Sequence, residues 1–173
     1  LGATMSLQRR LALLRWAGAN KAWIIEDDYD SEYRYTGPPL ASLQSLDRAG
    51  CVVYVGTLSK VLFPGLRLGY VVAPRELCPK LLQAKQAADL HTPSFNQRLV
   101  YEVIRDGFLD QHTPTIRARY RLQRDAMQAA LLAQMPEGTR WSAPQGGMFF
   151  WLRLPEGVDA LALLPLAVRE GIA

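Results

Sequence analysis

The sequence predicts an α/β protein built around a layered sheet. Short apolar runs of strand length, such as "AWII" at 22–25 and "CVVYVG" at 51–56, lie between longer stretches whose apolar residues recur with the period of a helix. Continuous apolar strands between helices are typical of such sheets. The 173 residues are enough to form a domain with a hydrophobic core.

The first helix is expected at 6–18. Ser6 is suited to cap its N-terminus, and Gly18 is expected to stop it. A buried strand at 22–30 should follow and end in acidic residues, before a loop at 37–47 that is rich in glycine and proline. One face of the helix carries the apolar residues Leu7, Leu11, Leu14 and Ala17.

Two further strands are expected at 51–57 and 67–74, the second closed by Pro74. Strands then give way to helical patterns. In order, we expect helices at 75–88, at 94–106 and after Pro114, a strand at 146–155, and a helix at 159–171.

The change of pattern near 74–115 predicts a second, smaller domain. We therefore assign 1–110 to part of a large domain and 111–173 to the start of a small C-terminal domain. The strand around 148–152 should belong to a separate sheet and bury alternate residues, and Gly146 and Gly147 should either allow close backbone approach or form a plain turn.

Composition excludes several classes of protein. No apolar run approaches the ~20 residues of a membrane span, and no leader resembles a signal peptide. Two cysteines without metal-ligand spacing are typical of a cytoplasmic protein with reduced thiols. The arginines between 117 and 124 resemble a nucleic-acid patch, but the apolar residues among and after them favour a solvated helix face.

Polar residues gather where two of the expected strands end. Ligands of open α/β sheets bind beyond the carboxyl ends of strands, so both groups should face one crevice. The first group is Asp27, Asp28 and Tyr29, and the second is Thr57, Ser59, Lys60 and Arg67.

Each of these residues has an ordinary structural interpretation, since a loop lysine is usually solvated and aspartates often cap turns. The combination of these residues at two neighbouring strand ends favours a chemical role for them instead. A lysine in apolar surroundings near positive charge forms a Schiff base with an aldehyde more readily, because its pKa falls. Hydroxyl groups and an arginine bind a phosphate dianion, and a carboxylate pairs with a protonated ring nitrogen. Pyridoxal phosphate presents all three groups.

The segments "IIEDDYDSEYRY" and "YVGTLSKVLFPGLRLGYVVAP" resemble the fold-type I pyridoxal phosphate-dependent aminotransferases of class I/II. The resemblance implies that Lys60 is the Schiff-base lysine, that Asp27 pairs with the pyridine nitrogen and that Tyr29 contacts the ring hydroxyl. It also implies three phosphate ligands. Strand alternation lets only one of Asp27 and Asp28 face the ring, and the family spacing selects Asp27. The implied phosphate ligands are Thr57, Ser59 and Arg67.

Two kinds of parent protein fit this resemblance. The first segment is most similar to the aminotransferase-like domain of MocR-type (GntR family) transcription regulators, which also bind DNA. The second half, through "APQGGMFFWLRLP", is more similar to aminoadipate and multi-substrate aminotransferases, which act on an amino acid and a 2-oxo acid. We take the enzyme as the main interpretation, with the regulator as the alternative.

The resemblance also implies that the sequence is a fragment. Family members carry an upstream phosphate-binding turn, a stacking aromatic residue and a downstream arginine for the substrate carboxylate, and no residue here matches them. The fragment alone is expected to be inactive. By analogy with the family, the parent protein should be a homodimer.

Overall fold

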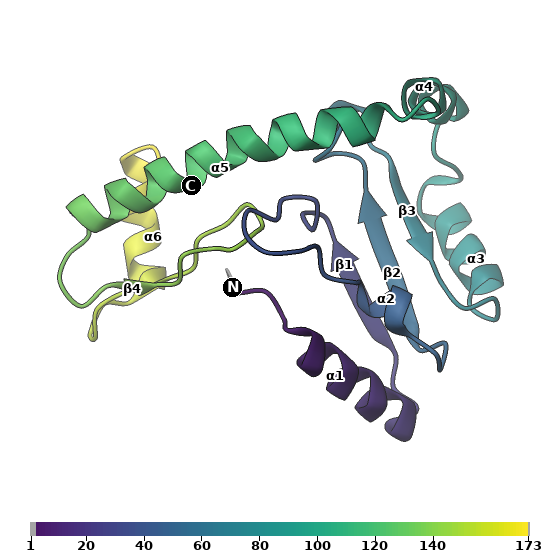
Figure 1. The fold of residues 1–173 in the computed structure, drawn as a ribbon, viewed down its shortest axis with the longest axis horizontal. Helices are drawn as coiled ribbons and strands as arrows, with labels where there is room; N and C mark the ends of the chain where they lie inside the picture. The colour runs from purple at the N-terminus through teal and green to yellow at the C-terminus, as the bar shows by residue number, and fades with distance from the viewer. Residues whose placement is uncertain (1–2, 173) are drawn as a thin grey trace.

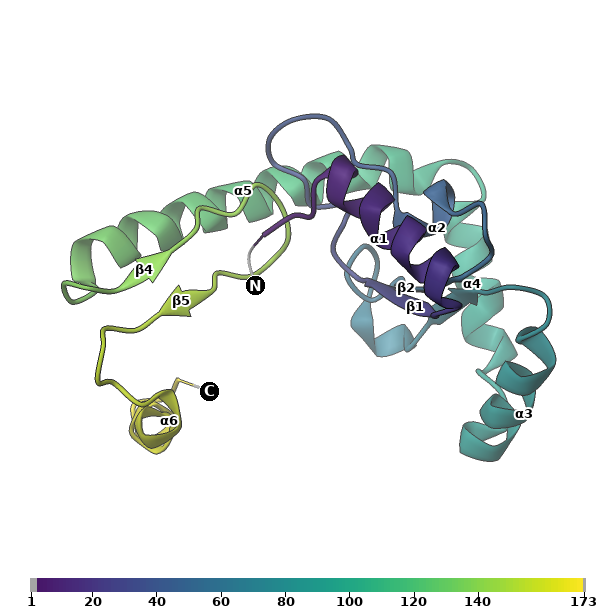
Figure 2. The same ribbon diagram turned by 90° about the horizontal axis from the view of Figure 1, so that it is seen from below.

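The computed structural model describes residues 3–172, which form two lobes joined by a long helix (Figures 1 and 2). A three-stranded sheet lies in the first lobe, and a two-stranded sheet with the last helix forms the second. The 27-residue helix α5 extends from one lobe to the other. The α/β prediction is confirmed. The predicted boundary at 110/111 lies within the first turn of α5, and the division into two domains stays a prediction.

Helix α1, Leu7–Asn20, begins as predicted. The Ser6 hydroxyl accepts a hydrogen bond from the Arg9 amide at 3.4 Å. The predicted stop at Gly18 was wrong, because Lys21 takes the left-handed conformation that ends the helix. Gly18 instead lies inside the helix, where a Cβ would be 3.7 Å from Ala49.

The first sheet has the order β1-β2-β3, with β1 and β2 parallel and β2 and β3 antiparallel. Buried residues from α1, α2 and β2 form a core on one face, which Ile24 of β1 joins. The opposite face carries Ile25 and Val71, whose side chains are 74% and 51% exposed. The strands are β1 (Ile24–Asp28), β2 (Val52–Thr57) and β3 (Gly69–Val72).

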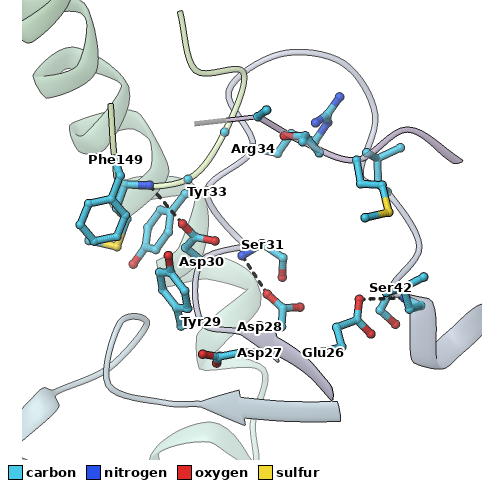
Figure 3. A pocket seen from close by; sticks show the side chains of 18 of the residues that line it. Glu26, Asp27, Asp28, Tyr29, Asp30, Ser31, Tyr33, Arg34, Ser42 and Phe149 are labelled. Atoms are coloured by element: carbon cyan, nitrogen blue, oxygen red, sulfur yellow. Dashed lines mark hydrogen bonds between the residues drawn. The ribbon is translucent and has the colours of Figure 1, made fainter. Parts of the chain in front are cut away.

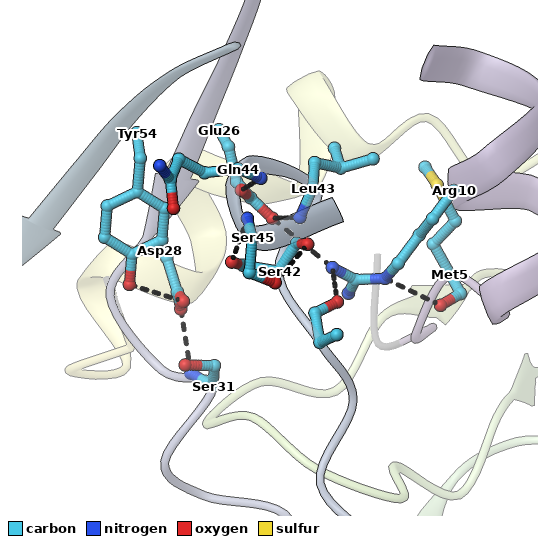
Figure 4. A network of polar contacts seen from close by, with 11 residues as sticks. Met5, Arg10, Glu26, Asp28, Ser31, Ser42, Leu43, Gln44, Ser45 and Tyr54 are labelled. Atoms are coloured by element: carbon cyan, nitrogen blue, oxygen red, sulfur yellow. Dashed lines mark hydrogen bonds and ion pairs between the residues drawn. The ribbon is translucent and has the colours of Figure 1, made fainter. Parts of the chain in front are cut away.

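Helix α2, Leu43–Leu46, is a single turn inside the predicted loop. Ser42 caps it, and the Glu26 carboxylate of β1 accepts the amides of Leu43 and Gln44 at 2.8 and 2.9 Å (Figure 4). Arg10 of α1 pairs with the same carboxylate at 3.3 Å. Glu26 therefore ties α1, β1 and α2 together, a role that the sequence pattern of a one-turn helix does not reveal.

Asp47 closes the turn between α2 and β2. Its carboxylate accepts four backbone amides, those of residues 49–52, at 2.7–3.1 Å. Burial raises the pKa of Asp47, but the hydrogen bonds from these amides outweigh burial and lower the pKa below its ordinary value. The charged form therefore stabilises the fold above the ordinary pKa, and this stabilisation is lost as pH falls through the lower, folded-state pKa.

We expect Asp47→Asn to lower the free energy of unfolding of the full-length protein by about 1 kcal/mol at neutral pH, since the half-exposed site is partly screened by water. The loss should shrink below about pH 4, where the unfolded carboxyl protonates. Urea unfolding at a series of pH values measures the loss of unfolding free energy at neutral pH and its decrease at acidic pH. Asp106→Asn is the control, because that side chain is 82% exposed. An equal destabilisation at pH 3 and pH 7 would contradict this account.

Helices α3 (Cys78–Asp89) and α4 (Ser94–Ile104) follow β3, and α5 spans Phe108–Gln134. We expected the long helix only after Pro114, and this was wrong. Gly107 takes a left-handed conformation just before α5, with φ of 77°, so the helix begins at Phe108, six residues before the proline, and includes it. No helix within residues 3–172 combines the length and apolar character needed to cross a bilayer.

The second lobe has less strand than predicted. Within the expected strand at 146–155, β5 (Leu152–Arg153) pairs antiparallel to β4 (Arg140–Trp141), and Gly146 forms an isolated antiparallel bridge with Arg34. This sheet is separate from β1-β2-β3, as expected. The expected alternation at 148–152 is present, but its inward residues are half-buried, while Phe149 and Trp151 are each 58% exposed. Helix α6, Ala160–Arg169, begins at the predicted cap, Asp159.

Candidate functional site

Most of the predicted site residues lie at or just beyond the carboxyl ends of two adjacent parallel strands. Asp27 and Tyr29 lie at the end of β1, while Thr57 ends β2 and leads into the turn with Ser59 and Lys60. The register pairs Asp27 with Val55. Because side chains two residues apart in a strand point the same way, Asp27 and Thr57 share one face of the sheet.

The structure separates the roles of Asp27 and Asp28. Asp28 accepts hydrogen bonds from the Tyr54 hydroxyl at 2.8 Å and from the Ser31 amide at 3.1 Å (Figure 4). Burial, and then this hydrogen bond, raise the pKa of Tyr54, so its hydroxyl remains a donor. Asp27 points to the other face, is exposed, and has no hydrogen bond or ion pair within residues 3–172 (Figure 3). Of the two, Asp27 has the carboxylate free to receive a ligand.

A cavity of about 360 Å³ lies beside the end of β1 and is lined by residues of both lobes (Figure 3). Tyr29 faces Phe149 edge-on, with ring centroids 6.2 Å apart. Burial first, then Asp30 and Asp27, raise the pKa of Tyr29. The Asp30 carboxylate accepts the Met148 amide at 3.2 Å, and burial is the largest cause that raises its pKa.

The glycine pair approaches the first lobe closely, which was the first of the two expected alternatives. A Cβ on Gly146 would lie 2.9 Å from the Tyr33 carbonyl oxygen. At Gly147, φ is 79°, and a Cβ would lie 2.8 Å from the Asp30 carboxylate. Sequence patterns did not single out Asp30 or Phe149. The signal that could have identified them is an acidic residue just after a strand and an aromatic residue just after a glycine pair.

Lys60 lies in the turn after β2, with its side chain exposed. The Thr57 hydroxyl shapes this turn, because it accepts the Ser59 amide at 3.1 Å and donates to the Leu68 carbonyl at 3.3 Å. A second cavity, of about 440 Å³, separates the turn from α5. Its lining includes Ser59 and Lys60 on one side and Arg119 and Tyr120 on the other.

The structure therefore places Asp27 and Tyr29 in the lining of the first cavity, and Ser59 and Lys60 in the lining of the second. Arg67 lines neither of them. It adopts a left-handed conformation after the short 3-10 helix η1, Pro64–Leu66, with φ of 52°, and its side chain is exposed. A single crevice shared by all these residues stays a prediction.

A family model described as aminotransferase class I and II matches residues 1–172. The chain belongs to this family. The class I and II aminotransferases depend on pyridoxal phosphate, and the match covers both strand-end segments that carry Asp27 and Lys60.

Individual relatives agree with both resemblances found in the sequence. The aromatic-amino-acid aminotransferase 1 of Thermococcus litoralis is 42% identical over 99% of this chain and 41% of its own length. The MocR protein of Rhizobium meliloti, a probable rhizopine catabolism regulator, is 30% identical over 99% of this chain and 35% of its own.

A solved structure gives the same result for the fold. The α-aminoadipate aminotransferase LysN of Thermus thermophilus, complexed with N-(5'-phosphopyridoxyl)-L-leucine, is 40% identical and superposes with a TM-score of 0.89. The superposition covers 97% of this chain and 44% of that one. The fold-type I prediction is confirmed, and the chain spans less than half the length of the relatives it matches.

The residues present fit pyridoxal phosphate in their chemistry. Lys60, Arg67 and Asp27 are exposed and have no ion-pair partner within residues 3–172. An amine, a guanidinium and a carboxylate are the groups that an aldehyde, a phosphate and a protonated ring nitrogen require.

Proposed function

We propose that the full-length protein is a pyridoxal phosphate-dependent aminotransferase, which transfers the amino group of an amino acid to a 2-oxo acid. One observation carries the proposal. The unpaired carboxylate of Asp27, in the last two residues of β1, and the turn with Lys60, directly after β2, lie at the same ends of two adjacent parallel strands, in the register that pairs Asp27 with Val55. In this proposal, the first lobe provides the lysine side of the cofactor site.

Each residue has a role in this proposal. Lys60 would hold the cofactor covalently and would carry a proton on its amine as general base and acid. Asp27 would hold a proton on the ring nitrogen, and Tyr29 would donate a hydrogen bond to the ring hydroxyl. When bound, the cofactor supplies an electron-accepting ring. Its phosphate is held by Arg67 and by the two hydroxyl groups of Thr57 and Ser59.

Borohydride reduction of the full-length protein tests the cofactor assignment, and an amino-transfer assay tests the activity. Peptide mass mapping should find the pyridoxyl group on Lys60. The assay should show transfer from an aromatic amino acid or 2-aminoadipate to a 2-oxo acid, since relatives named for these substrates match the chain. An adduct on Lys80 or Lys85 instead would overturn the site assignment.

The alternative is the effector domain of a MocR-type regulator, which several relatives favour. Such a protein would use the same cofactor site to control DNA binding. The parent reading frame distinguishes the two, because a regulator carries a winged helix-turn-helix segment upstream of Leu1. A full-length protein that binds cofactor and DNA, but transfers no amino group, would support the regulator.

We further propose that the parent protein acts in the cytoplasm as a homodimer. The support is analogy with the family, together with the exposed apolar side chains of this chain, such as Ile25 and Phe95 at 74% and 76%. We expect the full-length protein to sediment as a dimer at micromolar concentration. A monomer at that concentration would contradict the proposal.

A further inference from the structure

Tyr33 connects the ends of β1 and β2 beneath the candidate site. Its side chain is fully buried, and its hydroxyl donates a hydrogen bond to the backbone carbonyl of Lys60, 27 residues later. This side-chain hydrogen bond reaches the main chain of Lys60 from outside the turn that contains Lys60. The Lys60 side chain, in contrast, is exposed and unpaired within residues 3–172.

Tyr33 is itself held firmly in place. Its ring packs on Tyr120 of α5, with centroids 4.7 Å apart and planes at 59°. Its amide donates to the Asp30 carbonyl at 3.0 Å, and its own carbonyl accepts the Gly147 amide at 2.8 Å. Contacts from the strand end, from α5 and from the second lobe therefore fix the position of the hydroxyl.

The Tyr33 hydroxyl remains a donor over the working range of pH. Burial, followed by the neighbouring Tyr120, Tyr35, Glu32 and Asp30, raises the pKa of Tyr33 to about 12. The group therefore keeps its proton at any pH at which an amino-transfer assay is run, and the hydrogen bond to the Lys60 carbonyl persists.

We propose that Tyr33 is a positioning residue, which fixes the peptide group of Lys60 and thereby the direction in which the lysine amine projects. The inference rests on the proposed function of Lys60. A small change in the direction of a side chain that must reach a bound reactant has a large effect on rate, because reacting atoms need near-contact geometry. A side chain that hydrogen-bonds the backbone of the reactive residue supplies this geometry without touching the reactants.

Tyr33→Phe in the full-length protein removes the hydroxyl and keeps the ring that packs on Tyr120. In the cofactor-free form, we expect the backbone amides of 58–62 to lose about tenfold of their protection from hydrogen exchange, the loss of one hydrogen bond. In the loaded form, kcat should fall about tenfold while KM stays within about twofold.

Tyr35→Phe is the matched control. Tyr35 is also buried, and its hydroxyl also donates to a backbone carbonyl, that of Gly147 at 2.7 Å. Its ring lies under Arg124, at 4.9 Å. This variant should lose comparable stability and leave the exchange of 58–62 unchanged. If both variants change that exchange equally, or if neither does, the proposal is overturned.

If Tyr33→Phe does not fold, a second measurement tests the role of the Tyr33 hydroxyl. A difluorotyrosine at position 33 retains the hydroxyl but makes it a stronger acid, so the donor is lost at lower pH. Protection of 58–62 should then fall at a pH at which the unmodified protein keeps it, and constant protection would refute the role. Exchange in the cofactor-free form needs no catalysis, so failure of the aminotransferase proposal alone would appear only in the activity assay.

Discussion

Lys60→Ala should reduce amino transfer by the full-length protein at least about 10³-fold, because in the proposed function this one side chain both holds the cofactor and carries the transferred proton. The same change should abolish the borohydride-stable adduct. Cofactor should still bind, more weakly, since the phosphate ligands remain. Absorbance, peptide mass mapping and steady-state kinetics measure these effects.

Two further variants serve as controls for this result. Lys85→Ala should leave the adduct and the rate unchanged, because Lys85 pairs with Asp89 on α3 at 2.6 Å and lies in neither cavity lining. Arg67→Ala should give the reverse of the Lys60 result, with the adduct formed but the cofactor held less tightly by about 2–5 kcal/mol. Full activity in Lys60→Ala would contradict the assignment.

Asp27→Asn and Asp28→Asn should have different consequences, although the two residues are adjacent. Asp27→Asn removes the carboxylate that we propose keeps the ring nitrogen protonated, and we expect kcat to fall about 10²–10³-fold with little loss of stability. Asp28→Asn weakens the hydrogen bond from Tyr54, and we expect the free energy of unfolding to fall by about 1–3 kcal/mol.

Paired measurements of kcat and of urea unfolding on the full-length protein distinguish these outcomes. The expected pattern is a catalytic defect in the first variant and a stability defect in the second. The reversed pattern would mean that Asp28 faces the ring and that the family spacing selects the wrong aspartate.

The positions of the strands could be predicted from the sequence, whereas several boundaries could not. The apolar runs at 22–25 and 51–56 are continuous, so β1 and β2 lie where expected. The end of α1 depends on which residue takes a left-handed conformation, and Lys21 does so in place of Gly18. Pro114 suggested a helix start, but a helix accommodates proline after its first turn when it loses one backbone hydrogen bond.

The candidate site shows the same division. Strand ends placed Asp27 and Lys60 on adjacent strands, because side chains beyond parallel strands gather at one edge of a sheet. The hydrogen bonds from Tyr54 to Asp28 and from Tyr33 to Lys60 join segments distant in the chain, and no local pattern encodes them. The short pairing of β5 with β4 likewise depends on the path of the chain after α5, and so the strand predicted at 146–155 was too long.

The contact between Tyr33 and Tyr120 supports α5 near its middle. The helix has 27 residues, about 40 Å at 1.5 Å per residue, and Tyr120 lies close to its midpoint, so the helix can pivot about this contact. A tilt of about 5° there displaces the α6 end of the helix by only about 2 Å, from an arm of about 21 Å. The second lobe and the backbone of Lys60 are thus connected through α5, the contact between Tyr120 and Tyr33, and the Tyr33 hydroxyl.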